Sequence, residues 1–114
     1  MFAFPGGKVE IEDGKHQEDM LTHAITREIF EELGIVFDHK PRYVGSRYFF
    51  IPLQYKHVMH STFHYRWVDN TPPKIIPCPE EVPQYYWMSP KEIMDAQQSP
   101  PWLKSSLEII MKTF

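Results

Sequence analysis

The sequence has a single cysteine, Cys78, among its 114 residues. Internal disulfides are therefore excluded, which fits a reducing compartment. The chain also lacks any stretch near the roughly 20 apolar residues that span a bilayer, and its first residues lack the charged and apolar regions of a signal peptide. We therefore expect a cytoplasmic protein with no membrane partner.

An excess of positive charge is lacking as well. The formal net charge is −3, from 12 Lys and Arg against 15 Asp and Glu. This balance provides no broad positive field and argues against a protein held on nucleic acid mainly by phosphate contacts. With 42% hydrophobic and 24% charged residues, the chain can still build a core. At this length we expect one domain over residues 1–114.

Hydrophobic patterns predict the elements of the first half. From about Glu18 to Leu33 an apolar residue recurs at every fourth position, and Gly34 stands where a helix C-cap belongs. This predicts a helix. Two stretches rich in aromatic and β-branched residues, Tyr43–Ile51 and Met59–Trp67, are predicted to be strands.

The second half combines a loop, a short strand and two helices. Asp69–Pro83 is rich in proline and is predicted to be a surface loop, and Gln84–Met88 a short strand. Residues 89–92 match the N-cap, first-turn proline and third-position glutamate of a helix start. Apolar residues spaced over 103–111 predict a final helix. This order favours an α+β layered domain.

Three glutamates of the first helix form an unusual cluster. Glu28, Glu31 and Glu32 fall within roughly 100° on the helix wheel and overlap its apolar stripe, so they repel one another and lose solvation. A cation between them would remove this cost, and carboxylates suit Mg²⁺, which keeps free positions for substrate phosphates. The double glycine at 6–7 could supply a backbone carbonyl or approach a phosphate closely. The alternative is a solvated acidic face with Arg27 paired to Glu31.

The literal string around these glutamates resembles a known family signature. The Nudix signature is a glycine, five residues, a glutamate, seven residues, then Arg-Glu, an aliphatic residue, any residue, Glu-Glu, any residue, Gly and an aliphatic residue. Here Pro5-Gly6-Gly7-Lys8-Val9-Glu10 precedes Arg27-Glu28-Ile29-Phe30-Glu31-Glu32-Leu33-Gly34-Ile35. The second half is met at every specified position, a match expected by chance in on the order of one in 10⁵ chains.

The first half of the signature departs from this spacing. Counting back from Arg27 places Asp19 at the position of the first glutamate. Eleven residues then separate Gly7 from Asp19 instead of five, which predicts six inserted residues around Ile11–Gln17. Through the resemblance, Asp19 is expected to pair with or orient Arg27.

The resemblance implies a Nudix-like α/β/α sandwich with a mixed sheet, and hydrolysis of a phosphoanhydride in a nucleoside diphosphate derivative with Mg²⁺ or Mn²⁺. The implied metal ligands are Glu28, Glu31, Glu32 and the carbonyl of Gly6. The implied catalytic residues are Glu31, Glu32 and Glu81, with Glu80 a further candidate for the base. The implied substrate-binding residues are Gly7, Lys8 and Phe2.

Three functions remain open. The double glycine followed by Lys-Val-Glu resembles the MutT-like branch and favours a nucleoside triphosphate or a modified nucleotide as substrate. The second hypothesis is another substrate, such as ADP-ribose, a nucleotide sugar, a dinucleoside polyphosphate or an RNA 5′ end. The third is a catalytically silent binding module. An aromatic residue such as Phe2, Tyr48 or Trp67 is expected near the base.

The resemblance also suggests that a sheet element is missing. Nudix domains usually have a strand before the Pro-Gly-Gly segment, whereas only Met1–Phe4 precede it here. Because Phe2 and Phe4 alternate with Ala3, this segment is expected to form a short strand. An N-terminally shortened sheet would expose an open edge, which favours a homodimer, with a truncated gene product as the alternative.

Overall fold

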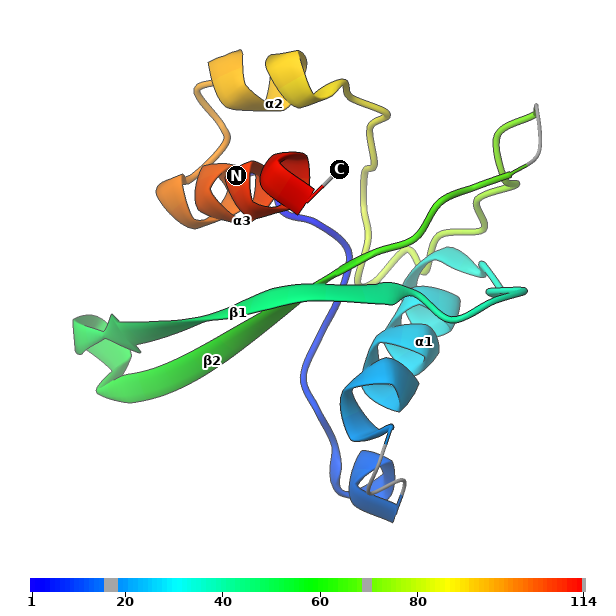
Figure 1. Ribbon diagram of the computed structural model, residues 1–114, viewed down its shortest axis with the longest axis horizontal. Helices are drawn as coiled ribbons and strands as arrows, with labels where there is room; N and C mark the ends of the chain where they lie inside the picture. The colour runs from blue at the N-terminus through cyan, green and yellow to red at the C-terminus, as the bar shows by residue number, and fades with distance from the viewer. Residues whose placement is uncertain (16–18, 69–70, 114) are drawn as a thin grey trace.

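The computed structural model describes residues 1–15, 19–68 and 71–113. Its elements are η1 (Ile11–Lys15, a 3-10 helix), α1 (Met20–Leu33), β1 (Arg42–Ile51), η2 (Pro52–Gln54, a 3-10 helix), β2 (Lys56–His64), α2 (Pro90–Asp95) and α3 (Pro101–Thr113) (Figure 1). The predicted α+β class is confirmed. Within these ranges, no helix has both the length and the apolar character needed to cross a bilayer.

The predicted first helix is confirmed over its described part. It ends at Gly34, whose left-handed φ of 69° lets its N–H donate to the Phe30 carbonyl at 2.9 Å. The predicted start at Glu18 lies outside the described residues, as do residues 16–17 of the predicted insertion and the predicted loop start at Asp69.

The sheet is an antiparallel hairpin of β1 and β2, with Arg42 opposite His64 at one end and Ile51 opposite Lys56 at the other. The hairpin extends away from the helices toward η2 (Figure 1). It is closed by Tyr55, whose φ of 48° makes the sharp turn. Both predicted strands are found, but in the described part of the chain the sheet has only these two strands, and the mixed sheet is not formed there.

Three details of the strand prediction are wrong. Gln84–Met88 and Phe2–Phe4 have the composition of strands but are not strands in the structure, because neither segment forms the ladder of main-chain hydrogen bonds with a neighbouring strand that a strand requires. The second strand ends at His64 rather than at Trp67. Beyond it, the Tyr65 ring lies between Phe37 and His39, with ring centroids 4.1 Å and 4.2 Å away.

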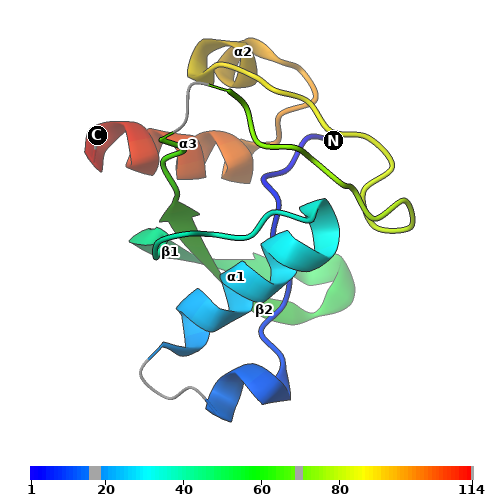
Figure 2. The ribbon, with the colours of Figure 1, turned by 90° about the vertical axis from the view of Figure 1, so that its right-hand side faces the viewer.

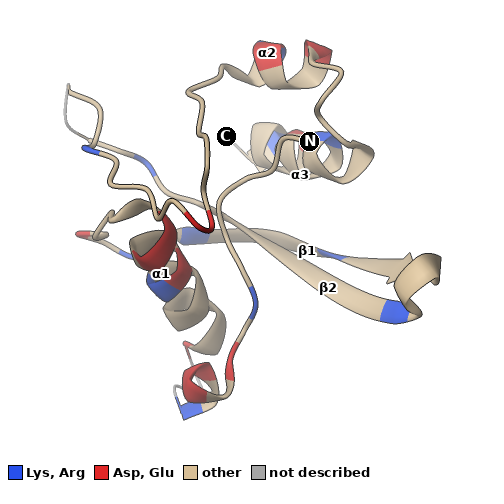
Figure 3. Ribbon diagram, turned by 180° about the vertical axis from the view of Figure 1, so that it is seen from behind, with Lys and Arg blue, Asp and Glu red and all other residues tan. Residues whose placement is uncertain are grey.

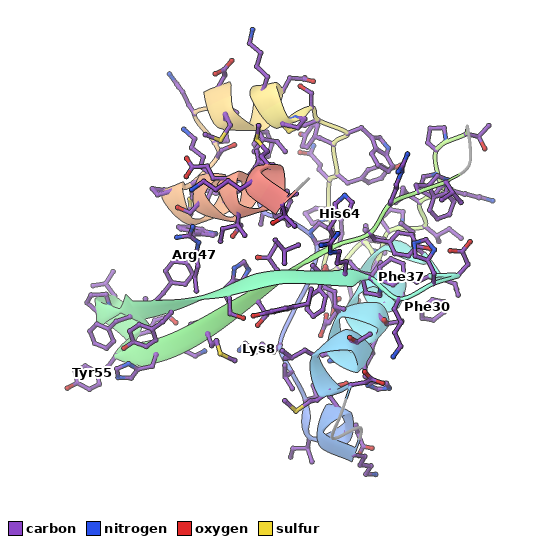
Figure 4. All side chains as sticks on the ribbon, in the orientation of Figure 1. Lys8, Phe30, Phe37, Arg47, Tyr55 and His64 are labelled. Carbon is purple, nitrogen blue, oxygen red and sulfur yellow. The ribbon has the colours of Figure 1, made fainter. Side chains whose placement is uncertain are left out.

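The two longer helices lie on opposite sides of the hairpin (Figures 1 and 2). Arg47 points from the hairpin toward α3 (Figure 4), where its Nη2 donates to the Ser105 carbonyl at 3.2 Å. Prolines aside, the buried hydrophobic side chains of the described residues come from these two helices and are Ala24, Ile29, Leu33, Leu103 and Leu107. The helix, hairpin, helix order gives the predicted layers of an α/β/α sandwich.

The predicted helix start at residues 89–92 is confirmed. Ser89 Oγ accepts from the Glu92 N–H at 3.2 Å, and Glu92 Oε1 accepts from the Ser89 N–H at 3.0 Å. This reciprocal capping satisfies two main-chain donors at the start of α2. The N-terminal segment also matters for the site: residues 1–10 start beside α3 and run past the hairpin to η1 and α1 (Figure 2).

Candidate active site

The double glycine lies directly against the acidic face of α1. The Gly6 N–H lies 3.4 Å from Glu32 Oε2 and donates to it. A Cβ at Gly7 would lie 2.2 Å from Glu28 Cδ, so only a residue without a side chain lets this carboxylate occupy its place. Backbone and carboxylates that are more than 20 residues apart in sequence therefore form one surface.

A third acidic segment reaches the same place from the loop before α2. The N–H groups of Ile76 and Cys78 donate to the carbonyls of Leu33 and Glu32, both at 2.8 Å. These bonds satisfy two carbonyls that the end of α1 leaves unpaired. They also bring the turn with Glu80 and Glu81 against the acidic end of α1 (Figure 3). The proline-rich loop is thus held against the helix.

The pKa of Glu32 is raised above its ordinary value. Burial is the main cause, and the neighbouring charges of Glu28, Glu81 and Glu31 add to it, while the hydrogen bond from the Gly6 N–H acts in the opposite direction. The three like charges that face Glu32 come from α1 and from the loop. The site therefore favours positive charge at this position.

Arg27 donates hydrogen bonds to two glutamates of the cluster and to the N-terminal segment. Its Nη1 donates to Glu28 Oε1 at 2.9 Å and to Glu31 Oε2 at 3.2 Å. Its Nη2 donates to the Lys8 carbonyl at 3.0 Å, which holds the segment after the double glycine. The pairing with Glu31 was expected as the alternative to a metal site, and the structure contains it.

The prediction that Asp19 pairs with Arg27 is wrong. Asp19 precedes α1 without capping it through its side chain, and its carboxylate pairs with Lys40 Nζ at 3.2 Å. Asp13 of η1 takes the place instead: its two carboxylate oxygens accept from Arg27 Nε at 3.3 Å and from Nη2 at 3.0 Å.

Asp13 is fully buried and has further partners. Its carboxylate accepts from the Glu10 N–H at 2.7 Å and lies 2.7 Å from His23 Nδ1. Hydrogen bonding to Arg27 is the largest cause that holds its pKa well below the ordinary value, followed by the bond from Glu10. The carboxylate is thus ionised and fixed.

The sequence contains a spacing that could have identified Asp13 as the acidic position of the signature. Five residues separate Gly7 from Asp13, which is the spacing of the first half of the signature. Counting back from Arg27 hides this match, because the extra residues lie between Asp13 and α1 rather than before the acidic position. Asp13 is one methylene shorter than the glutamate of the signature, yet it reaches Arg27 because η1 packs beside α1 (Figure 1).

The donor set suits a hard divalent cation. No group of three His, Cys, Asp or Glu side chains within the described residues is arranged to hold an ion, and Glu28 and Glu31 face Arg27. Mg²⁺, however, is commonly held by one or two carboxylates while it keeps several waters. Glu28 and Glu32 lie one turn apart beside the main chain of Gly6 and Gly7. These residues fit such an ion.

The predicted substrate-binding residues Lys8 and Phe2 lie in different parts of the structure, and so do the aromatic residues expected near the base. Lys8 is exposed on the segment between the hairpin and α1 (Figure 4). Phe2 lies away from the acidic face: its N–H donates to the Gln98 carbonyl at 2.8 Å and its ring meets the Tyr86 ring edge-on at 5.4 Å. Tyr48 is exposed on the hairpin, and Trp67 Nε1 donates to the Thr71 carbonyl at 2.9 Å.

Comparison with known proteins gives the same family as the resemblance of the site residues. The family model for the NUDIX domain matches residues 1–108. The comparisons with curated proteins and with solved structures each found no match. The matched range includes the double glycine, Asp13, Arg27, the glutamates of α1 and the loop with Glu81. Since the match covers nearly the whole chain, this protein belongs to the Nudix family, whose enzymes hydrolyse pyrophosphate bonds and generally use divalent metal ions.

Proposed function

We propose that this protein is a Nudix pyrophosphohydrolase that cleaves a phosphoanhydride of a nucleoside triphosphate or a modified nucleotide by metal-assisted attack of water. The observation that carries the proposal is the convergence of three segments on one acidic surface. Glu28 and Glu32 come from α1, the double glycine from the N-terminal segment, and Glu81 from the loop before α2. The carboxylates of this cluster repel one another and Arg27 pairs with only Glu28 and Glu31, so stability alone does not account for the arrangement.

Glu28 and Glu32 would hold Mg²⁺ or Mn²⁺, with the carbonyl of Gly6 and with Glu31 as further ligands. When bound, such an ion would neutralise negative charge on the substrate phosphates and lower the pKa of a water molecule. The pKa of Glu32 is raised mainly by burial and then by the neighbouring carboxylates, so a cation beside it would stabilise its ionised form. Arg27 keeps Glu28 and Glu31 on this face through its Nη1.

Glu81 is the preferred proton acceptor for the attacking water. Glu31 already accepts a hydrogen bond from Arg27 at 3.2 Å, which uses one of its oxygens. In the described part of the chain, the Glu81 carboxylate accepts no hydrogen bond, and the main chain of its turn is fixed by the bond from the Glu81 N–H to the Cys78 carbonyl at 3.1 Å. A positioned carboxylate with a free oxygen suits a general base.

Lys8 and Gly7 would bind the phosphates. The Lys8 side chain is exposed and takes part in no ion pair with a described carboxylate, while its carbonyl is held by Arg27. A cation fixed at its main chain beside an acidic cluster can pair with a substrate phosphate and offset its repulsion from the glutamates. The Glu28 carboxylate occupies the space that a side chain at Gly7 would fill, so Gly7 would contact a phosphate only through its main chain.

The test is a substrate panel with Mg²⁺ or Mn²⁺. Nucleoside triphosphates, oxidised triphosphates, dinucleoside polyphosphates, ADP-ribose and sugar nucleotides are incubated with the protein, and phosphate and pyrophosphate release is measured. We expect a monophosphate and pyrophosphate from a triphosphate. Turnover of ADP-ribose or a dinucleoside polyphosphate alone would contradict the triphosphate assignment. No turnover of any substrate would contradict the enzymatic function.

A further inference from the structure

A pocket lies in the loop that carries Glu81, outside the acidic cluster itself. It has a volume of about 320 Å³ and is lined by Pro77, Pro83, Gln84, Tyr85 and Tyr86. This volume is at the lower end of the range of small-molecule sites, and the pocket is shallow and open to solvent. None of the five lining residues carries a charge.

The pocket is connected to the candidate active site through the chain. Pro77 directly precedes Cys78, whose N–H donates to the Glu32 carbonyl, and Pro83 follows Glu81 by two residues. The turn between the two prolines is closed by the bond from the Val82 N–H to the Cys78 carbonyl at 2.7 Å. A ligand in the pocket therefore lies beside the segment that presents Glu81 to Glu32.

The lining has the chemistry of a base-binding surface. Tyr85 is 47% exposed and its ring contacts no other ring within the described residues, so it is open to a stacking partner. Aromatic rings stack on nucleobases of every type. The phosphates would not occupy this pocket, because it offers no cation and the acidic residues Glu80 and Glu81 lie beside it.

One polar group in the pocket is held in position. Tyr86 Oη donates to Gln84 Oε1 at 2.8 Å, which occupies the amide oxygen and leaves the amide N–H groups to donate. Tyr86 is itself supported, because the Phe2 ring meets it edge-on at 5.4 Å and the Phe2 N–H is bound to Gln98. An oriented amide N–H group beside an aromatic ring can donate a hydrogen bond to a carbonyl oxygen or a ring nitrogen of a base.

We infer that this pocket binds the nucleobase of the substrate, with Tyr85 stacking on the base and Gln84 donating to it, while the phosphates lie on Lys8 and the acidic cluster. The inference rests on the proposed function and adds a residue-level specificity site to it. It gives Phe2 a supporting role: Phe2 positions Tyr86 rather than contacting the base.

The kinetic test compares a nucleotide with a substrate that has no base. The variants are Tyr85→Ala, the conservative Tyr85→Phe, and as control Tyr55→Ala, an exposed tyrosine at the far tip of the hairpin (Figure 4). We expect Tyr85→Ala to raise the KM for the nucleotide about 10-fold, with kcat and the KM for inorganic tripolyphosphate unchanged. Tyr85→Phe and Tyr55→Ala should resemble the wild type. A nucleotide KM that Tyr85→Ala leaves unchanged would overturn the inference.

A second measurement separates the pocket from catalysis. Calorimetric titration of nucleoside monophosphates without divalent metal measures binding alone. We expect binding to the wild type and to Tyr55→Ala, weakened about 10-fold in Tyr85→Ala, and reduced discrimination between bases in Gln84→Ala. This result supports the pocket even if no substrate is hydrolysed. Equal binding by Tyr85→Ala and the wild type, or none by the wild type, would overturn it.

Discussion

Arg27 and Asp13 form a two-point contact, in which the Nε and Nη2 atoms of the guanidinium donate to the two oxygens of a fully buried carboxylate. The same Nη2 donates to the Lys8 carbonyl. One side chain of α1 therefore fixes both η1 and the segment that follows the double glycine. This contact determines where Gly6 and Gly7 lie relative to Glu28 and Glu32.

Removing the charge of Asp13 should destabilise the protein. In Asp13→Asn the Arg27 guanidinium loses its fully buried carboxylate partner and keeps only pairs with more exposed carboxylates, and removing one partner of a buried ion pair is costly. We expect the melting temperature, measured by circular dichroism, to fall by several degrees. Asp19→Asn is the matched control: its exposed pair with Lys40 is of a kind that contributes little, so the melting temperature should hardly change. A larger effect from Asp19→Asn would contradict the assignment of Asp13 as the partner of Arg27.

The same carboxylate should make the protein sensitive to acid. The folded pKa of Asp13 is depressed, so its stabilising contribution is fully present above the unfolded value of about 4 and is lost as the pH falls through the lower folded value. Urea titrations between pH 7 and pH 2 would measure this loss. The Asp13→Asn variant should lose less stability than the wild type over the acid part of this range. Parallel curves for the two proteins would argue against the prediction.

A side chain at Gly7 should disturb the site more than the fold. In Gly7→Ala the new Cβ would overlap the Glu28 carboxylate, which is the flexible end of a side chain and can move aside. We expect a small change in melting temperature but an apparent Mg²⁺ affinity in the activity assay weaker by about 10-fold or more. Gly14→Ala is the control, because a Cβ there meets nothing within 4 Å. Equal Mg²⁺ affinities for the two variants would show that Glu28 is not a ligand.

Glu32→Gln should separate catalysis from stability. Turnover with Mg²⁺ should fall on the order of 100-fold or more, because the variant loses a ligand charge but keeps its volume. Without metal the melting temperature at pH 7 should stay or rise: a raised folded pKa means that the ionised form is disfavoured in the folded protein. Glu108→Gln on α3, exposed and outside the site, controls for loss of one negative charge. Full activity in Glu32→Gln would remove its assignment as a ligand.

Local patterns in the sequence predicted the elements that depend on local physics. The spacing of apolar residues identified α1 and α3, and Gly34 and residues 89–92 identified helix ends. Aromatic and β-branched composition identified both strands of the hairpin. The spacing of Glu28, Glu31 and Glu32 placed them on one face, because helix geometry alone determines which side chains are neighbours. The family was indicated by the same short segment.

Tertiary structure decided which segments meet. Whether Asp13 or Asp19 pairs with Arg27 depends on how η1 packs beside α1, and whether Gln84–Met88 forms a strand depends on a partner elsewhere in the chain. The position of Glu81 over Glu32 follows from main-chain bonds between the loop and the end of α1. The sequence by itself determined the residue types and the local elements. Contacts between residues far apart in the chain were decided only by the fold, because packing and hydrogen bonding over long separations have no local pattern.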